Sequence, residues 1–219
     1  NIAAHELRTP IQPILGLTDI IYSKVKDKEQ HELLEIIMRN AYRLKRLTDN
    51  VLDVTKIESQ SLMLKKGKLN LNVLISEVLK EYVSKEVEQQ KIKIVYDFKP
   101  KDDIIVEADR VRLAQVIRNL IDNALKFSIN NQLIFVIVEL QKDKEDQVII
   151  SVKDTGAGIS KEVLPKLFSK FMTSDSSTGT GLGLYICKSI VEAHGGEICG
   201  ENNLDDRGAT FRFKLPIIK

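Results

Sequence analysis

Asn119-Leu120-Ile121-Asp122-Asn123-Ala124-Leu125-Lys126 is the stretch that decides the fold of the larger part of the chain. At about 100° per residue, Asn119, Asn123 and Lys126 fall within an arc of roughly 60° on one face of a helix. Another face gathers four apolar residues, Leu113, Val116, Leu120 and Ala124. We predict a helix that buries this apolar stripe against a sheet. Its two amides and one ammonium group then line a wall where a metal ion and phosphates can bind. An ordinary solvated helix face has the same composition, so further motifs must decide.

The composition excludes several classes of function. A chain of 219 residues with 43% hydrophobic residues predicts one or two domains with a packed core. The 33 Lys and Arg nearly balance the 31 Asp and Glu. We therefore expect no binding to nucleic acid and no membrane contact by this part of the protein. Cys187 and Cys199 are too few for a disulfide framework and are expected to be buried free thiols in a cytoplasmic protein.

The first residue is not a methionine, and the chain opens inside an apparent helix. No apolar run reaches the roughly 18 to 20 residues of a membrane span. We therefore expect upstream sensor domains, or a membrane anchor, in the full-length protein.

Residues 1–66 have the pattern of a helical hairpin. The first helix follows a seven-residue pattern, Ile11, Ile14, Ile21 and Val25 with Thr18 in the seam, which is broken at Lys26-Asp27-Lys28. The second runs from about Glu29 to Leu62 and carries a similar series, Leu34, Ile37, Ala41, Leu44 and Val51. Two helices cannot enclose a core, so we expect a homodimer with a four-helix bundle. The alternative is a hairpin that packs on its own second domain.

Residues 67–219 form the second domain, because Lys65-Lys66-Gly67-Lys68 interrupts the helical pattern. We predict a helix from Leu74 to Glu88, a helix capped by Asp109 that carries the opening motif, and a helix over 182–193. The predicted strands cover 92–98, 104–106, 133–140, 147–152, 197–200 and 209–215, with the third and fourth as antiparallel neighbours. The expected fold class is α+β, a mixed and mainly antiparallel sheet backed by helices.

Two glycine-rich stretches carry possible chemistry. Asp154-Thr155-Gly156-Ala157-Gly158 places a carboxylate at a strand end, where it can accept from the amino group of a base while the chain passes close to the ring. Gly179-Thr180-Gly181-Leu182-Gly183-Leu184 opens a helix, whose exposed N–H groups favour phosphate. It is not a dinucleotide-fold fingerprint, because it follows a Ser- and Thr-rich loop instead of a strand. Each stretch alone is weak evidence.

The order of the motifs is specific. An Asn/Asn/Lys helix, a strand ending in Asp-x-Gly-x-Gly, Phe168-Ser169-Lys170-Phe171, a polar loop and a helix opened by Gly-x-Gly-x-Gly together resemble the ATP-binding domain of sensor histidine kinases. Heat-shock chaperone, gyrase and mismatch-repair ATPases share this domain. His5-Glu6-Leu7-Arg8-Thr9-Pro10 resembles the phosphoacceptor box of the kinases and so distinguishes them within the set.

The resemblance implies a binding site for ATP and Mg²⁺. Asn123 would ligate the metal, with Asn119 beside it, and Lys126 would meet the phosphates. Asp154 would read the adenine amino group, with Gly156 and Gly158 shaping the base pocket. The phosphate loop would be formed by five residues, Gly179, Thr180, Gly181, Leu182 and Gly183.

The resemblance also implies a movable lid over the site. Phe168 and Phe171 would anchor Met172 to Thr178 as this lid. Lys170 stands where the family usually has arginine, so the contact with the γ-phosphate loses its two-pronged geometry.

The resemblance further implies a reaction at His5. Neutral imidazole would attack the γ-phosphate, with Glu6 as base and orienter. The phosphoryl group would pass to an aspartate on the receiver domain of a response regulator, and Thr9 would support phosphatase activity toward that regulator. Leu15, Leu17 and Tyr22 are candidates for choosing the regulator.

Pro10 and Pro13 remove two helical N–H groups, so we expect a bend just below His5.

Two other functions remain open. An ATPase or conformational clamp would use water as acceptor and a glutamate to activate it. The resemblance puts Asn119 at the position of that glutamate, and an amide cannot take the proton. A non-catalytic nucleotide-binding scaffold is the third possibility. Intact His5, Asn123 and Asp154 argue against it.

Overall fold

The computed structural model describes residues 2–82, 92–128, 132–141, 144–173, 180–204 and 207–218, with the backbone alone at 2–8 and 144–145. The chain divides into two compact units, Asn1–Leu62 and Met63–Lys219. The division falls slightly before the predicted boundary at residue 66. No described helix is both long and apolar enough to cross a membrane.

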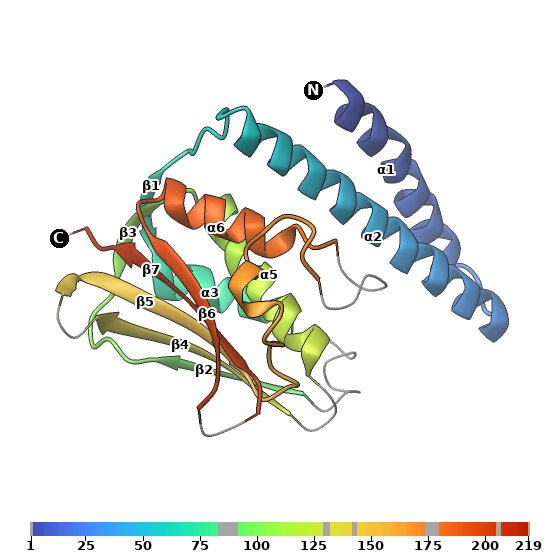
Figure 1. Ribbon diagram of the computed structural model, residues 1–219. Helices are drawn as coiled ribbons and strands as arrows, with labels where there is room; N and C mark the ends of the chain where they lie inside the picture. Colours follow the sequence, from blue (N-terminus) through green and yellow to red (C-terminus); the bar gives the residue numbers. More distant parts are fainter. Residues whose placement is uncertain are drawn as a thin grey trace. The chain divides into compact units, whose positions relative to one another are not determined.

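The first unit is a hairpin of α1 (Ile2–Tyr22) and α2 (Lys28–Glu58) (Figure 1). Asp27 caps α2, because its Oδ1 accepts a hydrogen bond from the Gln30 N–H at 2.9 Å. α2 ends before the predicted Leu62, because the chain turns at Ser59 and Gln60 adopts a left-handed φ of 51°. α1 is one continuous helix through both of its prolines.

The apolar residues of the hairpin form two stripes where the sequence suggested one. The stripe between the helices is buried and includes Ile11, Leu15, Thr18, Ala41, Thr48 and Leu52. The other, here called the outer stripe, consists of Ile14, Leu17 and Ile21 of α1 and Leu33, Ile37, Leu44, Leu47 and Val51 of α2, all 40–60% exposed. The predicted heptad series takes residues from both stripes, which lie roughly 100° apart around each helix.

The second unit contains a five-stranded sheet in the order β2-β4-β5-β7-β6. The strands are β2 (Lys93–Phe98), β4 (Leu133–Gln141), β5 (Lys144–Asp154), β6 (Glu197–Asn202) and β7 (Ala209–Pro216). β2 runs parallel to β4, and every other pair is antiparallel, including the predicted neighbours β4 and β5. The predicted mixed, mainly antiparallel sheet is confirmed.

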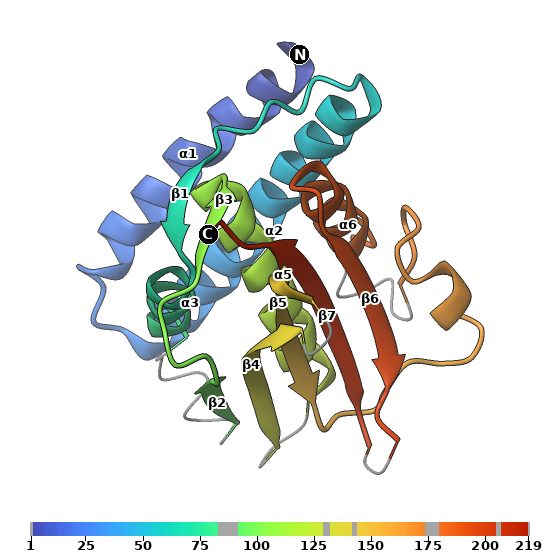
Figure 2. The same cartoon turned by 90° about the vertical axis from the view of Figure 1, so that its left-hand side faces the viewer.

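Three helices lie on one face of this sheet: α3 (Leu71–Lys80), α5 (Arg110–Phe127) and α6 (Gly183–Ala193) (Figure 2). The predicted apolar stripe of α5, with Leu113, Val116 and Leu120, is fully buried. It meets strand residues such as Ile134 and Ile150, which are equally buried and lie on the inner face. The sheet and α5 together therefore fix where the polar face of α5 lies.

The small second sheet was not predicted. β1 (Gly67–Asn70) pairs antiparallel with β3 (Ile105–Ala108). β1 reads as a charged linker in the sequence, and its partner lies far along the chain. A short 3-10 helix, η1 (Leu164–Lys166), was also missed.

The boundaries of α3 differ from the prediction as well. It begins earlier than predicted, because Asn70 caps it by accepting from the Val73 N–H at 3.2 Å. It ends at Lys80 rather than Glu88, and residues 83–91 lie outside the described part of the chain.

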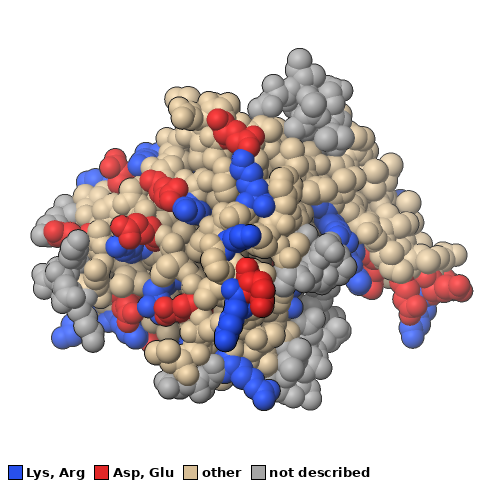
Figure 3. Space-filling view, in the orientation of Figure 1, with Lys and Arg blue, Asp and Glu red and all other residues tan. Residues whose placement is uncertain are grey.

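Charges of both signs are intermixed on the face shown in Figure 3, so no single-sign field is visible there among the described residues. Of the two cysteines, Cys187 is buried and Cys199 is exposed, so the expectation of buried thiols holds for Cys187 alone.

Candidate functional site

The polar face of α5 forms one wall of the candidate site. Asp109 fixes the start of the helix, because its Oδ1 accepts from the N–H groups of Val111 and Arg112 at 3.0 and 3.1 Å. Asn119 and Asn123 are half-buried. The side-chain Nδ2 of Asn119 is fully buried, and the Asn119 side chain interacts with the buried thiol of Cys187, where it acts to lower the pKa of that thiol.

The N-terminus of α6 lies beside this wall. A Cβ placed on Gly183, the first residue of α6, would lie 3.8 Å from Cγ of Asn119. The first N–H groups of a helix have no partner within that helix and favour anions. The structure therefore brings together two predicted parts of the site, the amides of α5 and the end of the glycine-rich loop.

Asp154 ends β5 and is 4% exposed. Its Oδ1 accepts two backbone hydrogen bonds, from Gly156 at 2.9 Å and from Ala209 at 3.2 Å. Its Oδ2 accepts none from the described residues. Burial raises the pKa of this carboxyl, while the backbone N–H groups of Gly156, Ala209 and Asp154 itself act in the opposite direction. One oxygen is thus locked by the backbone, and the other is left as an acceptor for an amino group.

Gly156 brings this carboxylate against the end of α5. A Cβ on Gly156 would lie 2.2 Å from the carbonyl oxygen of Phe127. Gly158 follows with a left-handed φ of 76°, which favours glycine. Lys126 directly precedes Phe127, and its amine lies 4.8 Å from the centroid of the Phe127 ring. Asp154, Gly156 and Lys126 are therefore neighbours in space although they are far apart in sequence.

The segment after η1 meets the expectation in part. The amine of Lys170 lies 5.1 Å from the ring centroid of Tyr185 on α6, which keeps it near the first turn of that helix. Phe168 is half-buried. Phe171 is 71% exposed with φ of 60°, so the expectation that its ring anchors the lid is wrong for this structure. Residues 174–178 of the predicted lid lie outside the described residues.

The glycine-rich loop is described from Thr180 onward, and Gly179 lies outside the described residues. Gly181 has φ of 65°, and a Cβ on it would lie 2.4 Å from the carbonyl carbon of Phe171, so it packs directly on that backbone. The hydroxyl of Thr180 accepts from the Leu182 N–H at 3.3 Å. The Leu182 side chain is 1% exposed and belongs to the core, so only its backbone can serve a ligand.

The phosphoacceptor box lies on α1, where His5 and Glu6 are described by their backbone alone. Thr9 is exposed on the same helix. Of the residues proposed for choosing a regulator, Leu17 is exposed, whereas Leu15 is buried between the two helices and is a poor candidate. The hydroxyl of Tyr22 donates to Glu35 on α2 at 3.0 Å.

Sequence reasoning missed the turn between β6 and β7. Asn203 Nδ2 donates to the backbone oxygen of Asp154 at 2.9 Å, and Asn203 Oδ1 accepts from the Thr210 hydroxyl at 2.6 Å. Gly208 has φ of 103°, and a Cβ on it would lie 2.2 Å from that same oxygen. The Asn- and Gly-rich composition signals a turn. It does not reveal that the turn holds the end of β5.

The comparisons with known proteins cover both units. Residues 108–219 match the family described as histidine kinase-, DNA gyrase B-, and HSP90-like ATPase, and residues 1–60 match the His Kinase A (phospho-acceptor) domain. The chain belongs to the histidine kinases.

Several known proteins are similar to this chain. The sensor protein KdpD of Clostridium acetobutylicum is 38% identical over 97% of this chain, which spans 24% of that protein. Full-length ShkA in complex with AMPPNP is 26% identical with a TM-score of 0.78, over 100% of this chain and 45% of ShkA. Histidine kinase ThkA in complex with response regulator protein TrrA is 32% identical with a TM-score of 0.66, over 99% of this chain and 60% of the solved one.

Proposed function

We propose that this chain is the catalytic core of a sensor histidine kinase, which binds ATP with Mg²⁺ and phosphorylates itself on His5. Nucleotide binding is supported above all by the hydrogen bonding of the Asp154 carboxylate. Two backbone N–H groups hold one of its oxygens, and the other oxygen is left open as an acceptor. Such a fixed acceptor in a buried site discriminates strongly for a ligand that donates there, as the adenine amino group does.

The residues of the site fit an adenine nucleotide with its metal. Asp154 would accept from the base, and the backbone at Gly156 leaves room for the ring. The side-chain oxygen of Asn123 would ligate Mg²⁺, with Asn119 beside it on the same helix face. When bound, the metal would neutralise charge on the phosphates. Lys126, Lys170 and the first N–H groups of α6 would hold the remaining phosphate oxygens.

The proposed reaction transfers one phosphoryl group. A ring nitrogen of neutral His5 attacks the γ-phosphorus, an N–P bond forms, and the bond from that phosphorus to the bridging oxygen of ADP breaks. The proton on the other ring nitrogen is held by Glu6, which keeps the attacking nitrogen unprotonated. ATP is a cytoplasmic substrate, so we place this part of the protein in the cytoplasm.

We propose a homodimer through the hairpin. The outer stripe runs along both helices and exposes eight large aliphatic side chains on one surface. A second copy of the same stripe would cover it in a four-helix bundle, because a two-fold axis brings identical patches together. Buried seam and outer stripe would then form one continuous core.

We propose a response regulator as the phosphoryl acceptor. The structure of ThkA with the regulator TrrA, a relative at 32% identity, supports this partner. Thr9 and the exposed Leu17 lie on the helix that carries His5 and would face the regulator. A phosphatase activity toward the phospho-regulator would use the Thr9 hydroxyl to orient water.

An ATPase clamp is the second candidate from this superfamily. The side chain at 119 is an amide, which accepts no proton from an attacking water, and this disfavours steady hydrolysis. The two candidates differ in where the γ-phosphate goes.

The deciding experiment is incubation with γ-labelled ATP and Mg²⁺, comparing the parent with His5→Gln and Asp154→Ala. The proposal predicts a protein label that is labile in acid, stable in alkali and lost in both variants. Free phosphate released at the same rate by parent and His5→Gln, with no labelled protein, would establish the ATPase instead.

A further inference from the structure

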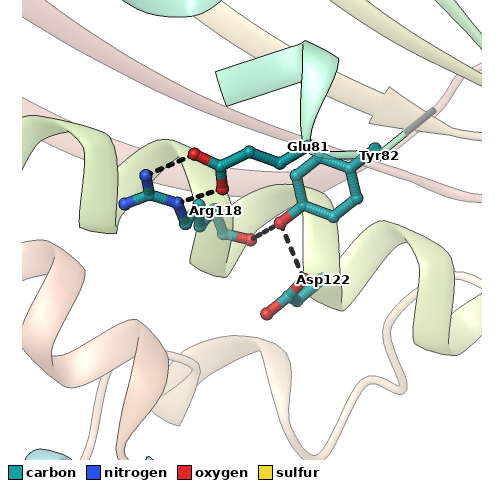
Figure 4. A network of polar contacts seen from close by, with 4 residues as sticks. All are labelled: Glu81, Tyr82, Arg118 and Asp122. Carbon is teal, nitrogen blue, oxygen red and sulfur yellow. Dashed lines mark hydrogen bonds and ion pairs between the residues drawn. The ribbon is translucent and has the colours of Figure 1, made fainter. Parts of the chain in front are cut away.

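A polar network joins the end of α3 to one turn of α5 (Figure 4). The guanidinium of Arg118 makes two parallel hydrogen bonds to Glu81, from Nε to Oε2 and from Nη2 to Oε1, both at 2.7 Å. Two-pronged pairs of this kind fix orientation as well as distance. Glu81 follows α3 directly and is held there by its own N–H, which donates to Val78.

The next residue, Tyr82, completes the network. Its hydroxyl lies 2.8 Å from Oδ1 of Asp122 and 3.3 Å from the carbonyl oxygen of Arg118, both of which can accept from it. Burial and the Asp122 carboxylate raise the pKa of Tyr82, so the hydroxyl remains a donor across the physiological range. Tyr82 and Glu81 thus hold both ends of the helical turn from Arg118 to Asp122.

That turn is the one that carries the two amides of the site. Asn119 follows Arg118, and Asn123 follows Asp122. An asparagine side chain is short, so the place of its oxygen is set by the position and rotation of the helix. A neutral oxygen is also a weak metal ligand compared with a carboxylate, and its contribution depends on accurate placement.

We propose that Tyr82 and the Glu81–Arg118 pair are positioning residues for the metal ligand, which set the register of the α5 turn and thereby the affinity of the nucleotide site for Mg²⁺. This inference rests on the proposed function, because it takes Asn123 as the metal ligand. The three residues are not proposed to contact the adenine base, which Asp154 would bind at the other end of the site.

The test uses Tyr82→Phe, with Tyr96→Phe as the matched control. Tyr96 is in the same unit, and its hydroxyl also donates to a side-chain oxygen, but this acceptor is Oδ1 of Asn72 on α3, at 2.8 Å. The affinity for ADP is measured by calorimetry in the full chain over a series of MgCl₂ concentrations.

For Tyr82→Phe we expect the Mg²⁺ concentration at the midpoint to rise roughly three- to ten-fold, the effect of one lost hydrogen bond. The affinity for ADP without Mg²⁺ should stay unchanged, and Tyr96→Phe should match the parent in both.

Glu81→Ala is the second variant, because the ion pair between Glu81 and Arg118 lies on the surface, where such pairs contribute little to stability. Its control is Glu139→Ala, which removes an equally exposed pair with Lys99 on the sheet. A smaller rise in the Mg²⁺ midpoint is expected for Glu81→Ala and none for Glu139→Ala.

Three results would overturn the inference. In the first, the Mg²⁺ concentration at the midpoint for Tyr82→Phe stays within about two-fold of the value for Tyr96→Phe. In the second, the affinity for ADP falls equally with and without Mg²⁺, which would mean a general loosening. In the third, the parent binds ADP without any response to Mg²⁺. A parent that binds ADP with the expected Mg²⁺ response but never labels His5 would sink the proposed kinase reaction and leave the positioning role standing.

Discussion

At Gly156 the chain passes so close to the end of α5 that a single methyl group has no room. A Cβ there would lie 2.2 Å from a carbonyl oxygen, which cannot yield as a flexible side chain would. We predict that Gly156→Ala costs about 1–3 kcal/mol of unfolding free energy. Because the strain falls beside Asp154, the affinity for ADP should fall by at least about ten-fold. Thermal unfolding and calorimetry measure the two effects.

Gly67→Ala is the control for that substitution, because a Cβ at Gly67 meets nothing within 4 Å. It should leave ADP binding as in the parent. Normal ADP affinity in Gly156→Ala would contradict the close approach of β5 and α5.

His194 is a buried histidine at the C-terminal end of α6. It is 4% exposed, and its Nε2 accepts from the Asp109 N–H at 2.9 Å while Nδ1 donates to the Ile190 carbonyl at 2.8 Å. Asp109 in turn caps α5 and accepts from the Lys65 N–H through Oδ2 at 2.9 Å. Burial lowers the pKa of His194, the Ile190 carbonyl opposes this, and nearby Lys66 adds to the lowering.

This histidine makes stability depend on pH in a predictable direction. Above its unfolded-state pKa of about 6.5, the ring is neutral in both states and the stabilisation is fully present. As the pH falls below that value, His194 becomes protonated in the unfolded chain but stays neutral in the folded chain. The unfolding free energy therefore decreases until the pH reaches the lowered pKa of His194 in the folded chain. Urea unfolding between pH 7 and 5 measures this decrease, and His194→Gln, whose amide can still accept from Asp109, should flatten it. An identical slope in the variant would contradict the assignment.

At the scale of elements, α5 could be predicted from its sequence. The helical repeat of 3.6 residues per turn determines both which residues form its buried apolar face and which form its polar face. Leu120 lies in the middle of the buried face and is inaccessible to solvent. We predict that Leu120→Ala costs about 3 kcal/mol of unfolding free energy, the usual cost of a cavity at such a position. Val111→Ala, at an exposed position of the same helix, should change stability little. Equal losses from the two would mean that the helix faces are assigned wrongly.

The elements that escaped prediction share a physical cause. β1 is short and charged, and it becomes a strand only because β3, far along the chain, supplies its hydrogen bonds. Asn203 of the β6–β7 turn holds the backbone of Asp154, and Tyr82, which follows α3, bonds to Asp122 of α5, 40 residues further along the chain. Local periodicity contains no record of such long-range contacts. It did place the carboxylate, the glycines and the amides in the right elements, because each depends on a strand end or a helix start.

At the scale of the whole molecule, the outer stripe of the hairpin predicts assembly. Ile37→Glu together with Leu44→Glu places two charges on a surface that a second copy should cover. Light scattering should give a dimer mass for the parent and a monomer mass for the double variant. Arg39→Glu, on the solvent side of the same helix, should remain dimeric. A monomeric parent, or an unchanged double variant, would contradict the four-helix bundle.

The central claim is that the phosphoryl group of ATP is bound covalently by His5. The most direct measurement is to incubate the chain with ATP and Mg²⁺, digest it under alkaline conditions that preserve phosphoramidates, and locate the phosphoryl group by mass spectrometry. We predict that the phosphoryl group lies on the peptide that contains His5 and nowhere else in the chain. A phosphoryl group on a serine, threonine or another histidine, or a chain that carries none while ATP is consumed, would contradict the account.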